Sequence, residues 1–277
     1  MKDNELLSFI DENNKLNKRK KKKKKQITIF FINILTITLL VGGGFGIKTI
    51  LDQKKDYEKS DKLQSDITNL YSNISEEILD VEFDKQENKT KEINSDFDKL
   101  IDKNSDTIGW IKVNNTRIDL PVVQTDDNDY YLTHDFNKEY NSMGWVYGDY
   151  RNDFKNLDQN NILYGHTYKD TIMFSSLQYV LDDNWLNNKD NYIIEFNTLY
   201  ENLNWEIFSI YTIPKTSDYL KVDFNGNEFI NFIDMLKKRS IKDFDVQFND
   251  DDKIITLSTC YINSKNRLVV HAKLIRN

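Results

Sequence analysis

Residues 253–260 have the sequence Lys253-Ile254-Ile255-Thr256-Leu257-Ser258-Thr259-Cys260, which predicts a β-strand that ends on the only cysteine of the chain. β-Branched residues dominate this run, and such residues favour extended backbone. A second predicted strand, Arg267–Leu274, begins seven residues after Cys260. If the two strands pair, the guanidinium group of Arg267 lies near the thiol.

Further strands are predicted upstream of this pair, and together they indicate a barrel. They are Ile108–Val113, Arg117–Val123, Gly144–Tyr147, Asn161–Tyr164, Tyr192–Phe196 and Glu206–Ile213. Eight short strands separated by turn-rich loops are typical of a closed or nearly closed β-barrel. One amphipathic helix, Glu228–Lys238, interrupts the series before the cysteine strand, with Asn227 as its expected N-cap.

The N-terminal part has the pattern of a membrane anchor. Lys18–Lys25 is an unbroken run of eight basic residues, and Gln26–Ile47 follows with no charged residue. As a helix these 22 residues span about 33 Å, which is enough for a bilayer core. Basic residues before the span place the N-terminus in the cytoplasm and everything from Lys48 onward outside the cell. A cleaved signal peptide and a buried soluble helix are the alternatives.

The segment between the predicted span and the barrel is charged and helical in pattern. Apolar residues recur every three or four positions at Leu63, Ile67, Leu70, Ile74 and Ile78. The expected organisation is a basic arm at 1–25, a transmembrane signal anchor at 26–47, a helical stalk with N-terminal helices at 48–104 and a β-barrel domain at 105–277. A partner-binding coiled coil is less favoured, because the apolar seam is short.

Charge and composition exclude several classes of function. Residues 1–47 contain 10 basic and 4 acidic residues, whereas the rest has 28 basic and 41 acidic residues. An acidic body disfavours nucleic-acid binding, which needs positive surface. A lone cysteine excludes an intramolecular disulfide framework and any cysteine-rich metal site. No two histidines have the spacing of metal ligands, so we expect no metal and no cofactor.

Few residues are candidates for chemistry. Cys260 is either a reactive thiol at a strand end or a buried, inert one. His166 follows a strand and a glycine in Leu163-Tyr164-Gly165-His166, whereas His134 and His271 are expected at the surface or the rim. An isolated arginine such as Arg267 is more often a surface residue in an ion pair than a residue of an active site.

These residues resemble the sortases, and specifically class B. The resemblance rests on Thr256-Leu257-Ser258-Thr259-Cys260, on Arg267-Leu268-Val269-Val270 and on Leu163-Tyr164-Gly165-His166. It extends over about residues 106–275, through Ile108-Gly109-Trp110-Ile111, Pro121-Val122-Val123-Gln124, Asp127-Asn128-Asp129-Tyr130-Tyr131-Leu132 and Gly148-Asp149-Tyr150-Arg151-Asn152. The helix before the cysteine strand and the helical region before the barrel also look like those of class B. Two features depart from the family pattern: the Tyr261–Asn266 connection is short, and Thr167 stands where asparagine is commoner.

The resemblance implies a mainly β, eight-stranded barrel enzyme with peripheral helices, anchored in the membrane of a Gram-positive cell. Such a transpeptidase cleaves a C-terminal sorting signal of a secreted protein through a thioacyl intermediate, with hydrolysis as a side reaction. It implies Cys260 as nucleophile, His166 as general acid and base, Arg267 as oxyanion ligand, and Ser258 and Thr259 as candidates for substrate contact. The acceptor is a peptidoglycan amine or, alternatively, the lysine amine of a pilin. A non-enzymatic stalked binding domain is the third hypothesis.

Overall fold

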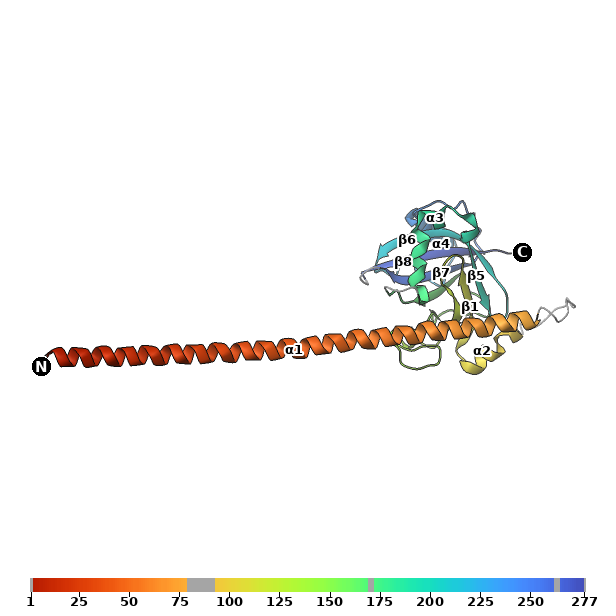
Figure 1. Ribbon diagram of the computed structural model, residues 1–277. Coiled ribbons are helices and arrows are strands. Elements are labelled where there is room, and N and C mark those ends of the chain that lie inside the picture. Colours follow the sequence, from red (N-terminus) through yellow and green to blue (C-terminus); the bar gives the residue numbers. More distant parts are fainter. Residues whose placement is uncertain (1, 79–92, 169–171, 262–264, 277) are drawn as a thin grey trace. The chain divides into compact units, whose positions relative to one another are not determined.

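The computed structural model describes residues 2–78, 93–168, 172–261 and 265–276 (Figure 1). Within these ranges, the side chains of residues 2–13, 72–78, 96, 260 and 261 lie outside the described part. The chain divides into two units, Met1–Lys55 and Asp56–Asn277. The domain boundaries proposed from the sequence remain predictions.

The second unit is built around a closed barrel of eight strands, which confirms the predicted architecture. The strands are β1 (Thr107–Val113), β2 (Asp119–Val123), β3 (Tyr147–Gly148), β4 (Asn160–Gly165), β5 (Ile193–Thr198), β6 (Asn204–Pro214), β7 (Ile254–Tyr261) and β8 (Asn266–Leu274). Their order around the barrel is β1-β2-β3-β4-β7-β8-β6-β5, and β1 pairs with β5 to close it. The β2–β3 and β4–β7 pairs are parallel, and the other pairs are antiparallel.

Side-chain alternation explains how each strand contributes to the interior. In β8, Leu268, Val270 and Ala272 are buried in the main core cluster. Val269 belongs to a second apolar cluster on the outer face of the same strand. Both faces of the middle of β8 are therefore covered, which explains why Val269 is apolar although it lies on the face opposite the main core.

The helix α4 (Glu228–Arg239) covers that outer face, lying across the barrel in Figure 1. Its apolar side packs against Phe208 of β6, and the hydroxyl of Ser209 donates to the carbonyl of Leu236 at 2.7 Å. This confirms the helix predicted before the cysteine strand. Asn227 occupies the N-cap position, but its side chain makes no cap hydrogen bond. The carboxylate of Glu228 instead accepts the N–H of Asn225 at 2.9 Å.

Short helical segments fill the connections. They are α2 (Asp98–Lys103), α3 (Asp183–Leu186) and the 3₁₀ helices η1 (Ser95–Phe97), η2 (Tyr130–Leu132), η3 (Met173–Leu181) and η4 (Lys189–Tyr192).

The long helix α1 (Lys2–Ile78) contributes its C-terminal part to the second unit. Ile67 is fully buried, and the ring of Tyr71 stacks on that of Trp110 with centroids 4.2 Å apart. Within the described residues, the Asn14–Tyr71 part of α1 is the one helix long and apolar enough to cross a membrane, with a mean hydropathy of 2.0 in its most apolar window. The span at residues 26–47 remains a prediction.

Candidate active site

The strand register brings three sequence-predicted residues to one end of the barrel. Gly165 at the end of β4 pairs with Thr259 of β7. His166 is the next residue after Gly165, and Cys260 is the next residue after Thr259, so the two lie at the same end of neighbouring strands. On the other side of β7, the Cα of Cys260 lies opposite that of Arg267 in β8. The thiol of Cys260 lies outside the described side chains.

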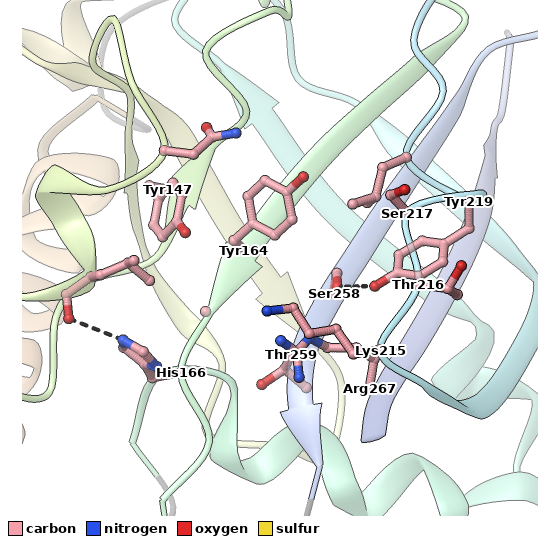
Figure 2. A pocket seen from close by; sticks show the side chains of 14 residues that line it. Tyr147, Tyr164, His166, Lys215, Thr216, Ser217, Tyr219, Ser258, Thr259 and Arg267 are labelled. Carbon is pink, nitrogen blue, oxygen red and sulfur yellow. Dashed lines mark hydrogen bonds between the residues drawn. The ribbon is translucent and has the colours of Figure 1, made fainter. Parts of the chain in front are cut away.

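A groove of about 620 Å³ lies beside this end of the barrel (Figure 2). His166 and Arg267 both line it. The other lining residues are Asn128, Leu132, Tyr147, Tyr164, Gly165, Lys215, Thr216, Ser217, Tyr219, Leu220, Ser258 and Thr259. This described lining includes the cations Lys215 and Arg267 and no carboxylate. The groove therefore favours anionic groups such as a thiolate or an oxyanion, although the body of the protein is acidic.

The ring of His166 is held by one backbone contact. Its Nε2 lies 3.0 Å from the carbonyl oxygen of Leu132. Because a carbonyl only accepts, Nε2 carries the proton, and Nδ1 is the basic nitrogen of the neutral ring. Burial is the main cause that lowers the pKa of His166 below its ordinary value, and the nearby charge of Arg267 lowers it further. The hydrogen bond to Leu132 opposes this shift.

Glycine at position 165 lets the end of β4 pack closely against η3. A Cβ placed there would lie 2.6 Å from Cγ of Phe174, which is nearer than real contacts allow. The residue before His166 therefore has to be small for the strand end to keep this position.

Ser258 and Thr259, the two residues predicted to touch substrate, both line the groove. The hydroxyl of Ser258 is 2.9 Å from that of Tyr219, and Figure 2 marks this hydrogen bond with a dashed line. The hydroxyl of Thr259 is hydrogen-bonded to that of Thr167. Both residues thus line the groove and are hydrogen-bonded to another side chain of the protein. Their contact with substrate remains a prediction.

The segment between β6 and α4 forms a wall of the groove that the sequence did not reveal. Asn160 of β4 donates through Nδ2 to the carbonyl oxygens of Tyr219, at 3.3 Å, and Lys221, at 2.8 Å. Arg151 donates to the carbonyl of Leu220 at 3.0 Å. Polar contacts across 59 to 69 residues of sequence therefore fix this wall.

Arg151 is itself held by a buried carboxylate. Its Nε and Nη2 each lie 2.8 Å from an oxygen of Asp149, whose side chain is fully buried. The hydroxyl of Tyr164, a groove residue, donates to the same carboxylate at 2.8 Å. Burial alone would raise the pKa of Asp149, but hydrogen bonds from the guanidinium and N–H of Arg151 and from the hydroxyl of Tyr164 lower it, so the carboxylate is ionised at neutral pH.

The prediction that His271 lies at the surface or rim is wrong, because the ring is fully buried beneath the β6–α4 segment. Its Nε2 lies 2.9 Å from the hydroxyl of Tyr211, and its Nδ1 lies 2.8 Å from the hydroxyl of Thr256. Burial lowers the pKa of His271 to about 3. Alternation along β8 identifies the face of this residue, but only the packing of the segment over it shows that the face is covered.

His271 is expected to make the protein less stable in mild acid. The unfolded chain binds a proton near pH 6.5 and the folded chain only near pH 3, so stability falls as pH drops through this window. Between pH 6.5 and 5 this group alone costs about 2 kcal/mol. Urea unfolding measures the free energy of unfolding at pH 7 and at pH 5. Between these two pH values, His271→Gln should lose about 2 kcal/mol less of this free energy than the parent loses. Equal losses in the two proteins would contradict the assignment.

Known proteins share this fold and this sequence pattern. A family model described as the sortase domain matches residues 111–275. The chain is 32% identical over 250 residues to sortase B of Staphylococcus aureus, covering 88% of this chain and 96% of the relative. It is 35% identical over 193 residues to sortase B of Listeria monocytogenes, covering 68% and 77% respectively.

Solved structures of sortase B and of a protein similar to it have the same fold as this chain. A Bacillus anthracis protein similar to sortase B superposes with a TM-score of 0.68 at 33% identity, over 80% of this chain and 98% of the other. A Staphylococcus aureus sortase B–substrate complex gives a TM-score of 0.68 at 30% identity, over 82% and 99%. The chain therefore belongs to the sortase family, as a class B sortase and a cysteine transpeptidase.

Proposed function

We propose that this transpeptidase cleaves a C-terminal sorting signal of secreted proteins and transfers them to a peptidoglycan amine, using Cys260, His166 and Arg267. The observation that carries the proposal is the register of β4, β7 and β8. It pairs Gly165 with Thr259 and Cys260 with Arg267, next to a cationic groove. Within the family, a lone cysteine at this strand end is the natural nucleophile.

In the first half-reaction, His166 takes the proton of the Cys260 thiol and becomes positively charged, and the thiolate attacks the carbonyl carbon of a threonine in the sorting signal. The negative charge that develops on the carbonyl oxygen is stabilised by the guanidinium of Arg267. Collapse of this intermediate breaks the peptide C–N bond, and His166 gives a proton to the departing amine. The products are a thioester on Cys260 and the released C-terminal fragment.

In the second half-reaction, the amine of the acceptor attacks the thioester carbonyl. His166 takes a proton from this amine, the C–S bond breaks and the Cys260 thiolate is restored. Water in place of the amine gives slow hydrolysis of the thioester. Attack on a carbonyl carbon places negative charge on its oxygen in each half-reaction. The cations in the groove stabilise this charge and the thiolate.

Replacement of Arg267 by lysine is expected to reduce kcat/KM about 100-fold, because a single ammonium group does not reproduce the planar fork of donors. Cleavage of a sorting-signal peptide, followed by chromatography, measures the rate. Arg276→Lys is the matched control, since Arg276 pairs with Asp251 near the chain end and lines no part of the groove. An unchanged rate in Arg267→Lys would contradict the oxyanion role.

We further propose that residues 26–47 anchor the enzyme in the cell membrane as a single span, with the N-terminus in the cytoplasm and the catalytic domain outside. The apolar part of α1 and the basic run before it support this topology. In a Cys260→Ala background, which removes the native thiol, alkylation of a cysteine introduced before or after the span by a reagent that does not cross membranes tests it. Labelling of the position before the span in intact cells would contradict it.

The acceptor is identified by supplying amines to the thioacyl-enzyme of the full chain. One related structure holds sortase B complexed with triglycine, so this peptide is one suitable probe. A peptide bearing a lysine side chain is the other, since polymerisation of pilin onto a lysine is the alternative function. Amide formation with a peptidoglycan-type amine supports the proposal, whereas transfer to lysine alone supports pilin polymerisation.

A further inference from the structure

A loop on the barrel surface supports the His166 segment from two sides. We call residues 132–142 the support loop. At its start, the carbonyl of Leu132 accepts the Nε2–H of His166 at 3.0 Å. At its end, the carbonyl of Ser142 accepts the hydroxyl of Tyr168, whose ring centroid is 5.5 Å from that of His166. The support loop therefore contacts the His166 ring directly at Leu132 and, through Tyr168, from a second side.

The support loop is closed and hydrogen-bonded within itself. The N–H of Asn141 donates to the carbonyl of Thr133 at 2.9 Å, which joins its two ends. Inside the loop, the fully buried side chain of Asp135 accepts the N–H groups of Asn137 at 2.9 Å and Glu139 at 3.1 Å. These hydrogen bonds connect the two ends and the interior of the support loop to one another.

The C-terminal part of α1 holds the support loop through two charged residues. The carboxylate of Asp56 accepts the hydroxyl of Ser142 at 2.7 Å and its N–H at 3.1 Å. The ammonium group of Lys59 lies 2.9 Å from Asp135 and 2.6 Å from Glu139. These contacts raise the pKa of Lys59 and lower that of Glu139, so the pair stays charged over the neutral range. Asp56 thus binds the end of the support loop at Ser142, and Lys59 binds its interior at Asp135 and Glu139.

We propose that Asp56 and Lys59 of α1 are positioning residues for His166, acting through the support loop. The inference rests on the proposed catalytic role of His166. It gives the helix a function beyond attachment: in the sequence, Asp56 comes nine residues after Ile47, the end of the predicted span. The same helix that is expected to leave the membrane therefore helps to set the geometry of the general acid and base.

The test compares variants of the full chain in detergent micelles, with a sorting-signal peptide as substrate. Asp56→Ala is expected to lower kcat about 10-fold and to change KM less than twofold, because a misplaced catalytic group affects the transition state and not peptide binding. Asp56→Asn keeps an oxygen that accepts the bonds from Ser142 and should recover most of the rate. Asp61→Ala is the matched control: Asp61 is on the same helix but pairs with Arg117, outside the support loop.

Two further measurements separate positioning from loss of stability. In a His166→Ala background, Asp56→Ala should cause no additional loss of rate. Nitrogen-15 NMR of the His166 ring should show protonated Nε2 as the dominant tautomer in the parent and in Asp56→Asn, and a mixture of tautomers in Asp56→Ala. The NMR result does not depend on turnover, so it tests the inference even if no peptide is cleaved.

Distinct results would overturn the inference and the proposed function. Equal kcat in the parent and Asp56→Ala, an equal loss in Asp61→Ala, or an unchanged ring tautomer would overturn the positioning role alone. A parent enzyme that forms no thioester with any sorting-signal peptide would overturn the proposed function and leave the NMR result to judge the positioning role.

Discussion

Cys260→Ala is expected to abolish peptide cleavage, with a loss on the order of 10⁴-fold or more in kcat, because no other nucleophile replaces the thiolate. The chain has one cysteine, so no second thiol can take over the reaction. The rate is measured by release of the C-terminal fragment of a sorting-signal peptide. Alanine is close to cysteine in size, and the strand around position 260 should keep its pairing.

Two control measurements separate loss of the nucleophile from loss of the fold or of peptide binding. Thermal unfolding of Cys260→Ala should stay within a few degrees of the parent, which shows that the barrel is intact. Peptide binding, measured by fluorescence anisotropy, should also be retained. Residual cleavage at a tenth of the parent rate would mean that Cys260 is not the nucleophile.

His166→Ala is expected to reduce cleavage of the same peptide by about 10² to 10⁴-fold, since the departing amine then leaves without a proton from a positioned acid. In the structure, the ring is held by Leu132 and its pKa is lowered by burial, so it is largely neutral at pH 7 in the free enzyme. The prediction is that protonation of the ring accompanies formation of the thiolate during reaction.

A change of leaving group isolates this role. An ester substrate that releases a weakly basic alcohol needs little proton donation, and His166→Ala should cleave it much closer to the parent rate. Equal losses for the ester and the peptide would show that His166 acts by another route, such as binding or support of the groove.

The barrel was largely predictable because the pattern of apolar and polar residues within each segment identifies a strand or a helix. Alternating apolar residues defined the strand Arg267–Leu274, which the structure extends by one residue to Asn266–Leu274. The amphipathic pattern of Glu228–Lys238 defined α4 to within one residue. The predicted strand Gly144–Tyr147 corresponds to β3, Tyr147–Gly148, because the chain pairs with Tyr164 and Leu163 only from Tyr147 onward.

The surroundings of the site were not predictable, because they depend on contacts between distant residues. Tyr219 meets Ser258 across 39 positions, and Asp56 meets Ser142 across 86. Neither pair carries a spacing signal in the sequence. The motif around Asp149 and Arg151 was visible only as part of the family resemblance, and its role as a brace between Tyr164 and Leu220 comes from packing.

The most direct test of the account is mass spectrometry of the full chain mixed with a sorting-signal peptide and no added amine. We expect an adduct on the tryptic fragment that contains Cys260, equal in mass to the peptide portion ending at threonine, and its release by hydroxylamine identifies a thioester. Addition of an acceptor amine should convert the adduct into an amide product. Cleavage of the peptide with no adduct on Cys260, or the same adduct on Cys260→Ala, would contradict the account.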